Sequence, residues 1–553
     1  MAMRITTKMM QNTSLRNLNT NKARQELLTT QMTTGKKISR PSDDPVIAIR
    51  SLRLNASLDK IDQFKEKNAE DAQSWLELTD AAISTVNGIL INDVRKNIVQ
   101  AANGILEYKD RKAIVENLNN AAKEIYATGN ADSAGRCLFT GYRTDTSLSF
   151  KEDKVETYSI TEQFNNSRID KITYVATGEL KNINEGNFDT YDIEQVTQYE
   201  VTTNDIYRIR LSYNDNDKLV KQMKADGTEY TDAEGRPVCE PNITFSYGDF
   251  SEGGSTTVYS ANTLYDENGN AMNTGQIQVR DSGTEEAYMI VVNDPDAVVY
   301  IAETGELLLG ENVKEKLAER TANTEMRVTY EKSNWQEGDL DPIHYFYTER
   351  TQERTGRTLQ YNPQFLTQGY NPDTKQIIEY DVGNNQMLRV NTTADELFTH
   401  NIGRDIDEVV DMLDEYGVLD DNYNTIKSMI DSEKYDGDEL TKLETELEAI
   451  NKARTMVKDK LQKRCKELIT DCDGYIEATT LAETNCGSRE SRLNLIKSRL
   501  NVQQTNFKEL VSENEDADYT ELAIQLKSVE MTYEAALSSI SYVMQTSLLD
   551  FIG

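Results

Sequence analysis

The chain has 553 residues, of which 37% are hydrophobic and 28% charged, and its formal net charge at pH 7 is −34. This length exceeds what one compact core accommodates, so we expect two to four domains. The acidic balance argues against nucleic acid or an anionic membrane surface as a partner, because phosphate binding needs clustered Lys and Arg. We also expect no membrane insertion, since no apolar run approaches the roughly 18 residues that span a bilayer.

The N-terminal segment predicts a helix without a secretory signal. Its first residues lack the apolar core of a cleavable signal, so export is expected to use another route. Residues 1–34 are polar and helix-permissive, with Gly35 suited to end the helix and Lys36 and Lys37 beside its negative end. An interrupted apolar stripe runs along this helix: Ile5, Met9, Leu15, Leu18, Leu28 and Met32.

The loop at residues 38–45 predicts the start of a second helix. Asp44 can cap the free amides of the first turn, and Pro45 fits there because its missing N–H costs nothing. The pair Asp43–Asp44 could suggest acid–base catalysis. Capping is the favoured interpretation, since a proline follows and no partner base is nearby.

Two hydrophobic seams with steps of three and four follow, a spacing that keeps one stripe facing a partner helix. The first comprises Leu54, Leu58, Ile61, Ala72, Trp75, Ala82, Val86 and Ile89, with polar gaps at Lys65, Asn68 and Thr79. The second comprises Val94, Ile98, Ala101, Ile105, Tyr108, Val115, Ala122 and Tyr126, broken by Lys112 and Asn119. A turn at 138–145 closes this helical half.

From about 146 to 390 the pattern indicates strands. Alternation at period two appears at 206–213 and 242–247, and the short apolar runs at 288–292 and 297–301 are also typical of strands. Turn dipeptides stand at 226–227, 234–235, 268–269 and 294–295. We expect one or two β-rich domains without an internal repeat.

Helical spacing returns from about 395 and continues to the C-terminus. A polar break at 513–518 precedes a last helix whose seam reads Leu522, Leu526, Val529, Tyr533, Ala536, Ile540 and Val543, with Leu548 beyond it. The fold class is therefore α+β multidomain, with long coiled-coil-like helices from both termini packed together and a β-rich insertion in the middle of the chain. The expected domains are an inner terminal coiled coil (1–40 with 512–553), a helical rod (41–145 with 390–511) and a surface-exposed β-rich insertion (146–389).

Little in the sequence indicates catalysis. The five cysteines (Cys137, Cys239, Cys465, Cys472 and Cys486) are scattered, so a disulfide framework is not expected. Cys465 and Cys472 share a helix face, which weakly suggests a metal or a bridge, but buried free thiols are favoured. With only His344 and His400 present, His-rich metal chemistry is excluded. We expect no catalytic residue, cofactor or metal; a hydrolase using paired carboxylates in the insertion remains an alternative, although no phosphate loop or Gly-x-Ser-x-Gly elbow supports it.

Six stretches carry a resemblance to a known family: 3–6, 34–45, 71–76, 138–145, 389–398 and 487–493 with the last helix. Through them, residues 1–145 and 385–553 resemble the bacterial flagellin family. Within that family, the sequences at 41–45 and 547–551 resemble those of members that join the flagellar hook to the filament more than those of the filament subunit itself. The middle of the chain carries no such resemblance, and residues 430–480 look longer than the family's usual return helix.

The resemblance implies a structural component of the bacterial flagellum, outside the cell at the hook–filament junction, exported by the type III route. The implied partners are copies of the same chain in a ring, flagellin, the neighbouring hook-associated protein and a cytoplasmic export chaperone. Terminal helices with incomplete stripes are expected to be partly disordered in a monomer and to order on assembly. The alternatives are a filament subunit, or a surface adhesin whose insertion binds glycans or protein through exposed tyrosines.

The residues expected to matter follow from the same resemblance. Subunit packing is expected to use Ile5, Leu15, Leu18, Leu28, Leu522, Leu526, Val529, Tyr533, Ile540, Val543 and Leu548. The helix–loop motif comprises Gly35, Arg40, Pro41, Asp43, Asp44 and Pro45.

Overall fold

The computed structural model describes residues 7–103, 108–177, 180, 184, 186, 188, 201–221, 239–250, 254–261, 264–265, 271–273, 276–282, 285–318, 325–352, 357–367 and 376–549. The chain divides into two compact units. The terminal unit comprises Met1–Gln73, Glu379–Leu388 and Glu490–Gly553, and the central unit comprises Ser74–Ile378 and Arg389–Arg489. Long helices at both ends enclose the β-sheets in sequence, which confirms the predicted α+β class. The division into three domains stays a prediction.

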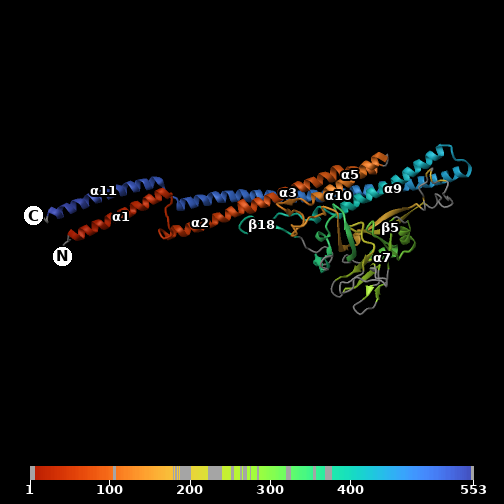
Figure 1. Cartoon of the computed structure of the whole chain (residues 1–553), viewed down its shortest axis with the longest axis horizontal. Coiled ribbons are helices and arrows are strands. Elements are labelled where there is room, and N and C mark those ends of the chain that lie inside the picture. Colours follow the sequence, from red (N-terminus) through yellow and green to blue (C-terminus); the bar gives the residue numbers. More distant parts are fainter. Residues whose placement is uncertain are drawn as a thin grey trace. The chain divides into compact units, whose positions relative to one another are not determined.

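The terminal unit is helical. It contains α1 (Thr7–Thr34), α2 (Pro45–Gln63), the start of α3 (Ala69–Ile89), the end of α10 (Gly437–Glu515) and α11 (Tyr519–Leu549). Helices α1 and α11 lie side by side (Figure 1), and Leu28, Leu522 and Val529 form a small buried cluster between them. The break between α10 and α11 falls where the polar residues at 513–518 predict it.

A π-helical turn shifts the register of the first seam. Phe64 and Ala69 are both buried although five positions separate them, and η1 (Phe64–Asn68) lies between them. A π turn holds one residue more than an α turn, so it keeps both side chains on one face. The predicted polar gaps lie in this turn: Lys65 donates to Gln504 Oε1 at 2.8 Å, and Asn68 donates to the carbonyl oxygen of Asp381 at 2.7 Å.

The central unit joins a helical part to two β-sheets. Its helices are the remainder of α3 and α10, the π-helix η2 (Leu90–Arg95), α4 (Lys96–Ala102), α5 (Tyr108–Thr128) and α9 (His400–Asp431). Trp75, Ile83 and Leu90 are fully buried along this part. The third polar gap, Thr79, is buried as well, and its hydroxyl donates to the Trp75 carbonyl oxygen at 2.7 Å.

The cysteines of α10 complete this helical core. Cys465 and Cys472 are buried free thiols, which confirms the favoured interpretation for these two. Cys137 and Cys486 are buried free thiols as well, and the Cys239 side chain lies outside the described part. Burial raises the pKa of Cys465 and of Cys472 to about 12. These two thiols therefore stay protonated and unreactive at neutral pH.

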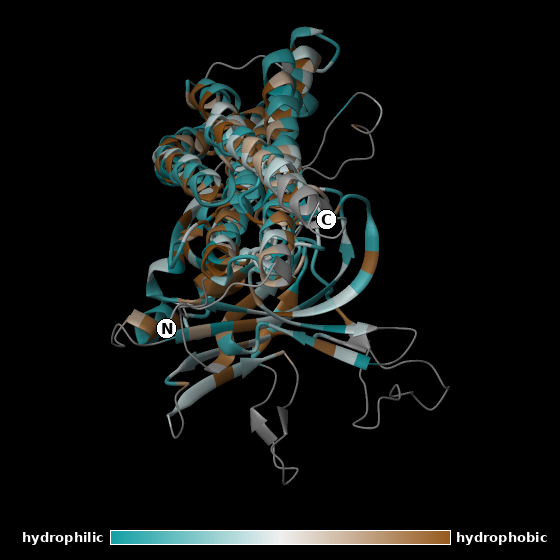
Figure 2. Cartoon of the chain, turned by 90° about the vertical axis from the view of Figure 1, so that its left-hand side faces the viewer, coloured by the Kyte–Doolittle hydropathy of each residue, from teal (hydrophilic) through white to brown (hydrophobic). Residues whose placement is uncertain are grey.

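The β region forms two sheets that share one core. The six-stranded sheet has the order β17-β16-β3-β15-β8-β9, with β3 (Lys154–Phe164), β8 (Thr244–Gly248), β9 (Thr256–Ser260), β15 (Glu325–Trp335), β16 (Tyr347–Gln352) and β17 (Arg357–Tyr361). The five-stranded sheet has the order β12-β13-β14-β5-β4, with β4 (Ile169–Ala176), β5 (Thr202–Arg210), β12 (Ile277–Arg280), β13 (Val298–Ile301) and β14 (Glu306–Leu309). Tyr158, Tyr330 and Trp335 of the first sheet pack with Ile209 and Leu307 of the second. Figure 2 shows hydrophobic and hydrophilic residues alternating along the helices and strands.

Smaller elements complete the fold. Four short antiparallel pairs are β1 (Asp132–Ser133) with β2 (Arg136–Cys137), β6 (Val220–Lys221) with β7 (Cys239–Glu240), β10 (Leu264–Tyr265) with β11 (Ala271–Asn273), and β18 (Glu379–Asp381) with β19 (Met387–Arg389). Short helices are α6 (Glu285–Asn293), α7 (Glu311–Ala318) and α8 (Gln364–Thr367). Within the described residues, no helix is long and apolar enough to cross a membrane.

One predicted strand is wrong. Residues 288–292 belong to helix α6, which connects β12 to the parallel strand β13. Parallel neighbours require a crossover connection, usually a helix, and Ala287 and Val291 bury one face of α6 in the cluster with Val299. The other strands are confirmed with shifted bounds: 206–213 falls in β5 as far as Arg210, 242–247 in β8, and 297–301 in β13. A turn at Asp294 is confirmed by the 3.1 Å bond from Ala297 N to Asp294 O, whereas 226–227, 234–235 and 268–269 lie outside the described residues.

Candidate functional site: the terminal helices and the helix–loop motif

Gly35 ends α1 in a left-handed conformation. Its φ is +72°, and its N–H donates to the carbonyl oxygen of Gln31 at 2.8 Å. Residues with a Cβ disfavour this conformation. A Cβ on Gly35 would also lie 2.9 Å from the hydroxyl oxygen of Tyr519. Glycine is therefore suited to this position, as the sequence predicts.

The loop after α1 is bonded to the break between α10 and α11. The Lys37 amide donates to the Glu515 carbonyl oxygen at 2.6 Å, and the Ala517 amide donates to the Gly35 carbonyl oxygen at 2.9 Å. The Lys36 ammonium lies 2.7 Å from Asp516 Oδ1 and 3.1 Å from Glu515 Oε2. These bonds fix the end of α1 beside the start of α11.

The two aspartates of the motif are backbone acceptors. Asp44 Oδ1 accepts from the amides of Val46 at 2.9 Å and Ile47 at 3.1 Å, with Pro45 in the first helical turn, so the predicted cap is confirmed. Asp43 Oδ2 accepts from the amides of Arg40 at 2.8 Å and Ser39 at 3.1 Å. Both carboxylates stabilise backbone geometry. The other two motif residues, Arg40 and Pro41, are exposed.

Glu515 connects α2 to the same junction. Its Oε1 accepts from Asn55 Nδ2 at 2.7 Å and from the Ser51 hydroxyl. The hydrogen bond from Ser51 lowers the pKa of Glu515, and a hydrogen bond from Lys36 lowers the pKa of Asp516. Both carboxylates are thus held ionised at neutral pH, with their charges used inside the chain.

Among the described seam residues, the terminal seam is closed only near this junction. Leu28, Leu522 and Val529 are buried, and Leu526 packs against them. Farther along, Leu18, Tyr533 and Ile540 are half-buried and Leu15 is 50% exposed. Ile5 lies outside the described residues, as do the side chains of Val543 and Leu548. Other apolar side chains of the two helices are exposed: Met9, Met10, Leu27, Met32, Ile524, Met531 and Leu537.

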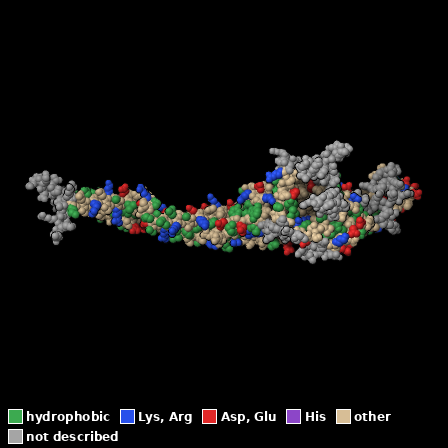
Figure 3. Space-filling view, turned by 90° about the horizontal axis from the view of Figure 1, so that it is seen from below, with side chains coloured by type: hydrophobic (Ala, Val, Ile, Leu, Met, Phe, Trp, Pro, Cys, Tyr) green, Lys and Arg blue, Asp and Glu red, His purple; other side chains and the backbone are tan. Residues whose placement is uncertain are grey.

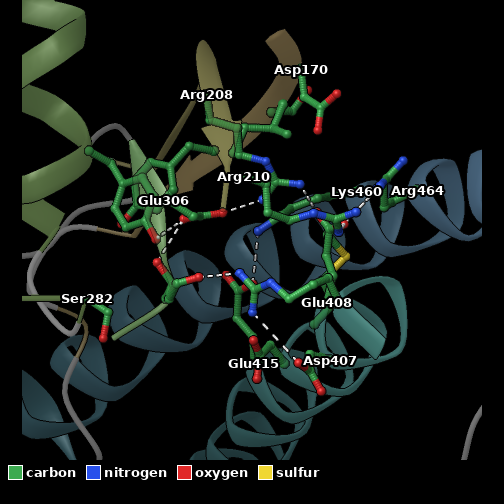
Figure 4. A pocket seen from close by; sticks show the side chains of 18 of the residues that line it. Asp170, Arg208, Arg210, Ser282, Glu306, Asp407, Glu408, Glu415, Lys460 and Arg464 are labelled. Atoms are coloured by element: carbon green, nitrogen blue, oxygen red, sulfur yellow. Dashed lines mark hydrogen bonds and ion pairs between the residues drawn. The ribbon is translucent and has the colours of Figure 1, made fainter. Parts of the chain in front are cut away.

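The central unit contains a charged cavity of about 740 Å³ between β-sheet and helices (Figure 4). Glu408 of α9 lines this cavity and contacts Arg208 and Arg210 of β5 and Arg464 of α10. Arg208 also pairs with the buried Glu306. Because these charges neutralise one another, the cluster is suited to fasten the sheet to the helices. Among the described residues, no group of three or more His, Cys, Asp or Glu could hold a metal ion.

Sequence reasoning did not find this cluster. Its one local signal is the spacing of Arg208 and Arg210. Side chains two positions apart lie on the same face of a strand, so the two cations share one face, and the apolar side chain of Ile209 between them points to the other. Their acidic partner is 200 positions away from Arg208 in the sequence.

Both histidines are half-buried in the central unit. Burial lowers the pKa of His344 to about 4 and that of His400 to about 3. The rings of Tyr213, Tyr345 and Phe346 surround His400, whose Nε2 lies 2.9 Å from the Tyr213 hydroxyl. Both imidazoles are accordingly neutral core groups.

The comparisons with known proteins match the two ends of the chain. Residues 5–144 match the bacterial flagellin N-terminal helical region, and residues 469–552 match the bacterial flagellin C-terminal helical region. The two ends of the chain belong to the flagellin family. The flagellin-family regions include the helix–loop motif and the seam of the terminal helices, whereas both β-sheets and α9 lie outside them.

Two curated relatives are flagellar hook-associated proteins 3. The one from Escherichia coli (strain K12) is 29% identical over 153 residues, which is 28% of this chain and 47% of that protein. The one from Salmonella typhimurium (strain LT2) is 30% identical over 144 residues, 26% of this chain and 45% of that protein. The chain thus spans slightly less than half the length of these relatives.

Solved structures with similarity include FlgL from Xanthomonas campestris and a putative flagellar hook-associated protein from Vibrio parahaemolyticus. The first is 12% identical, with 83% of this chain and 99% of that chain covered and a TM-score of 0.26. The second is 12% identical, with 86% and 100% covered and a TM-score of 0.32. These scores are too low to support an argument about shared arrangement.

Proposed function

We propose that this protein is a structural subunit of the bacterial flagellum that joins the hook to the filament. The observation that carries the proposal is the pair of flagellin-family regions at the two chain ends, together with relatives named hook-associated protein 3. Such a subunit acts by packing against its neighbours, so we propose no catalytic residue or cofactor.

The terminal seam provides the packing surface. A single chain buries the seam around Leu28 and Val529 but leaves Leu15 and neighbouring apolar side chains in water. Neighbouring copies would cover that remainder, so that ordering of the terminal helices is coupled to assembly. Contacts between different surfaces of identical copies propagate along a helical array or close into a ring. The helix–loop motif would fix the angle at which α1 and α11 leave the junction.

The location and partners follow from the same proposal. The subunit would be exported by the type III route, accompanied in the cytoplasm by a chaperone. Outside the cell it would form a ring that contacts the neighbouring hook-associated protein on one side and flagellin on the other. The three predicted domains would then be an inner coiled coil, a rod and an outward β-rich insertion.

Deletion of the gene tests this function. Electron microscopy should show hooks without filaments, and flagellin should accumulate in the medium; a plasmid copy of the gene should restore filaments. Filaments that persist in the deletion strain would contradict the proposal. The remaining hypotheses would then be a minor filament subunit or a surface adhesin built on the same helices.

A further inference from the structure

Strand β15 of the central unit carries a buried lysine, Lys332. Figure 3 shows many Lys and Arg side chains on the surface of the molecule, where water solvates their charge. The Lys332 side chain, by contrast, is 2% exposed, and no other lysine of the described residues is buried. A lysine is almost never fully buried unless a partner compensates its charge. The groups around the Lys332 nitrogen therefore decide its chemical state.

The contacts of Lys332 leave a positive charge poorly compensated. Its Nζ donates to the carbonyl oxygen of Asn214 at 2.7 Å and lies 5.4 Å from the centre of the Trp335 ring. Its acidic neighbour is Asp339, whose Oδ2 is 3.9 Å from Nζ. A hydrogen bond between an ammonium and a carboxylate group is about 2.7–2.9 Å long. The two side chains are thus adjacent without forming a hydrogen-bonded ion pair.

Burial favours the neutral forms of both groups. It lowers the pKa of Lys332, and the negative charge of Asp339 offsets only part of that effect. It also raises the pKa of Asp339, and the positive charge of Lys332 again offsets only part of the effect. A neutral amine is a nucleophile, and a protonated carboxyl group is an electrophile that can release water. Burial therefore shifts each group toward its reactive form.

The backbone holds the two groups beside each other. Lys332 is fixed by the pairing of β15 with β3. The carbonyl oxygen of Asp339 accepts from the Phe150 amide at 2.9 Å, and the Gly338 amide donates to the Phe150 carbonyl oxygen at 2.9 Å. The Asp339 carboxylate also accepts from the Gln336 amide at 3.1 Å. Groups held in this way react far faster than free molecules do, because the entropy of bringing them together is already lost.

We propose that the side chains of Lys332 and Asp339 condense to an amide bond that cross-links the chain to itself. The lone pair of Lys332 Nζ attacks Cγ of the protonated Asp339, the bond from Cγ to the hydroxyl oxygen breaks, and the hydroxyl group leaves with one proton from Nζ as water. No oxidant, reductant or further reactant is required. The Asp339 side chain is 26% exposed, so the water can escape. The bond would lock β15 to the turn that holds Phe150, a modification that goes beyond the proposed function and does not depend on it.

Peptide mapping of the purified full-length chain tests the bond. Trypsin cleaves after lysine and arginine, but not after a lysine whose amine forms an amide. We expect peptide 328–350 to stay uncut after Lys332 and to be lighter than its sequence by one water molecule. The control is Lys218, which forms ion pairs with Asp281 and Glu303 but is 35% exposed; it stays hydrated and charged, so trypsin should cleave after it. Complete cleavage after Lys332, giving peptides 328–332 and 333–350 of unchanged mass, would overturn the inference.

Two variants separate this bond from other losses of water. Asp339→Ala removes the electrophile, and Lys332→Arg keeps the positive charge but replaces the amine by a guanidinium group that stays protonated. The intact mass of each variant should equal the mass calculated from its sequence, whereas the wild type should be one water molecule lighter. A deficit of one water molecule that persists in either variant would place the loss elsewhere and overturn the inference. Because the assay reads a covalent bond in the purified chain, its outcome is independent of whether deletion strains lose their filaments.

Discussion

Replacement of Glu408 by glutamine should strongly destabilise the central unit. Glu408 is 10% exposed and lies 3.1 Å from Arg210 Nη1, 2.9 Å from Arg464 Nη2 and 2.5 Å from Arg208 Nη2. Removal of one partner from a buried ion pair leaves the remaining charges uncompensated, at a cost of about 3–5 kcal/mol. Here three guanidinium groups lose a common carboxylate.

The pKa of Glu408 supports the same magnitude. Burial alone would raise it, but Arg208, Arg464 and Arg210 more than offset that effect and lower it from 4.5 to about 2. The shift corresponds to roughly 3 kcal/mol of stability. Since the folded pKa is depressed, this stability is present above pH 4.5 and is lost as the pH falls toward 2.

Denaturant unfolding followed by tryptophan fluorescence measures the effect. Both tryptophans, Trp75 and Trp335, are buried in the central unit, so fluorescence reports that unit. We expect Glu408→Gln to lower the free energy of unfolding by about 3 kcal/mol. The control is Glu467→Gln, whose 51% exposed carboxylate lies 3.4 Å from Arg464 and should contribute less than about 0.5 kcal/mol. A loss below about 1 kcal/mol for Glu408→Gln, or an equal loss for the control, would refute the reasoning.

Three further changes test other parts of the molecule. Leu526→Asp with Ile540→Asp should abolish assembly into flagella while tryptophan fluorescence of the central unit stays unchanged; incorporation of this variant would contradict packing through the terminal seam. Gly35→Ala should raise the rate of amide exchange at the α1–α11 junction about fivefold, because the left-handed conformation costs an alanine roughly 1 kcal/mol of backbone strain. Gly88→Ala should not raise it, because an added Cβ would meet open space there. His400→Phe should reduce the loss of folding stability as the pH falls below 6.5. In the wild type, the unfolded histidine binds a proton there that the folded ring, with a pKa lowered to about 3, does not bind. A variant whose stability falls with pH as steeply as that of the wild type would contradict this.

The parts of the fold that depend on local chemistry could be predicted from the sequence. Gly35 ends a helix and Asp44 begins one because each acts on backbone groups within four positions of itself. The seams and the break at 513–518 are likewise periodic or compositional signals. The spacing of Cys465 and Cys472 likewise predicts that the two thiols share one buried helix face.

Features set by distant partners could not be predicted. The apolar run in α6 has no period that separates strand from helix, and its state follows from the parallel pairing of β12 with β13. The π turn at Phe64–Asn68 keeps Phe64 and Ala69 on one buried face, and no spacing in the predicted seam indicates it. The cluster around Glu408 depends on residues from β5, α9 and α10, which no local pattern connects.

Immunogold labelling of intact flagella tests the central claim most directly. With the protein tagged in the β-rich region of the native gene product, the account predicts gold confined to the boundary between hook and filament. Gold distributed along the filament would contradict a junction role and would instead identify a filament subunit.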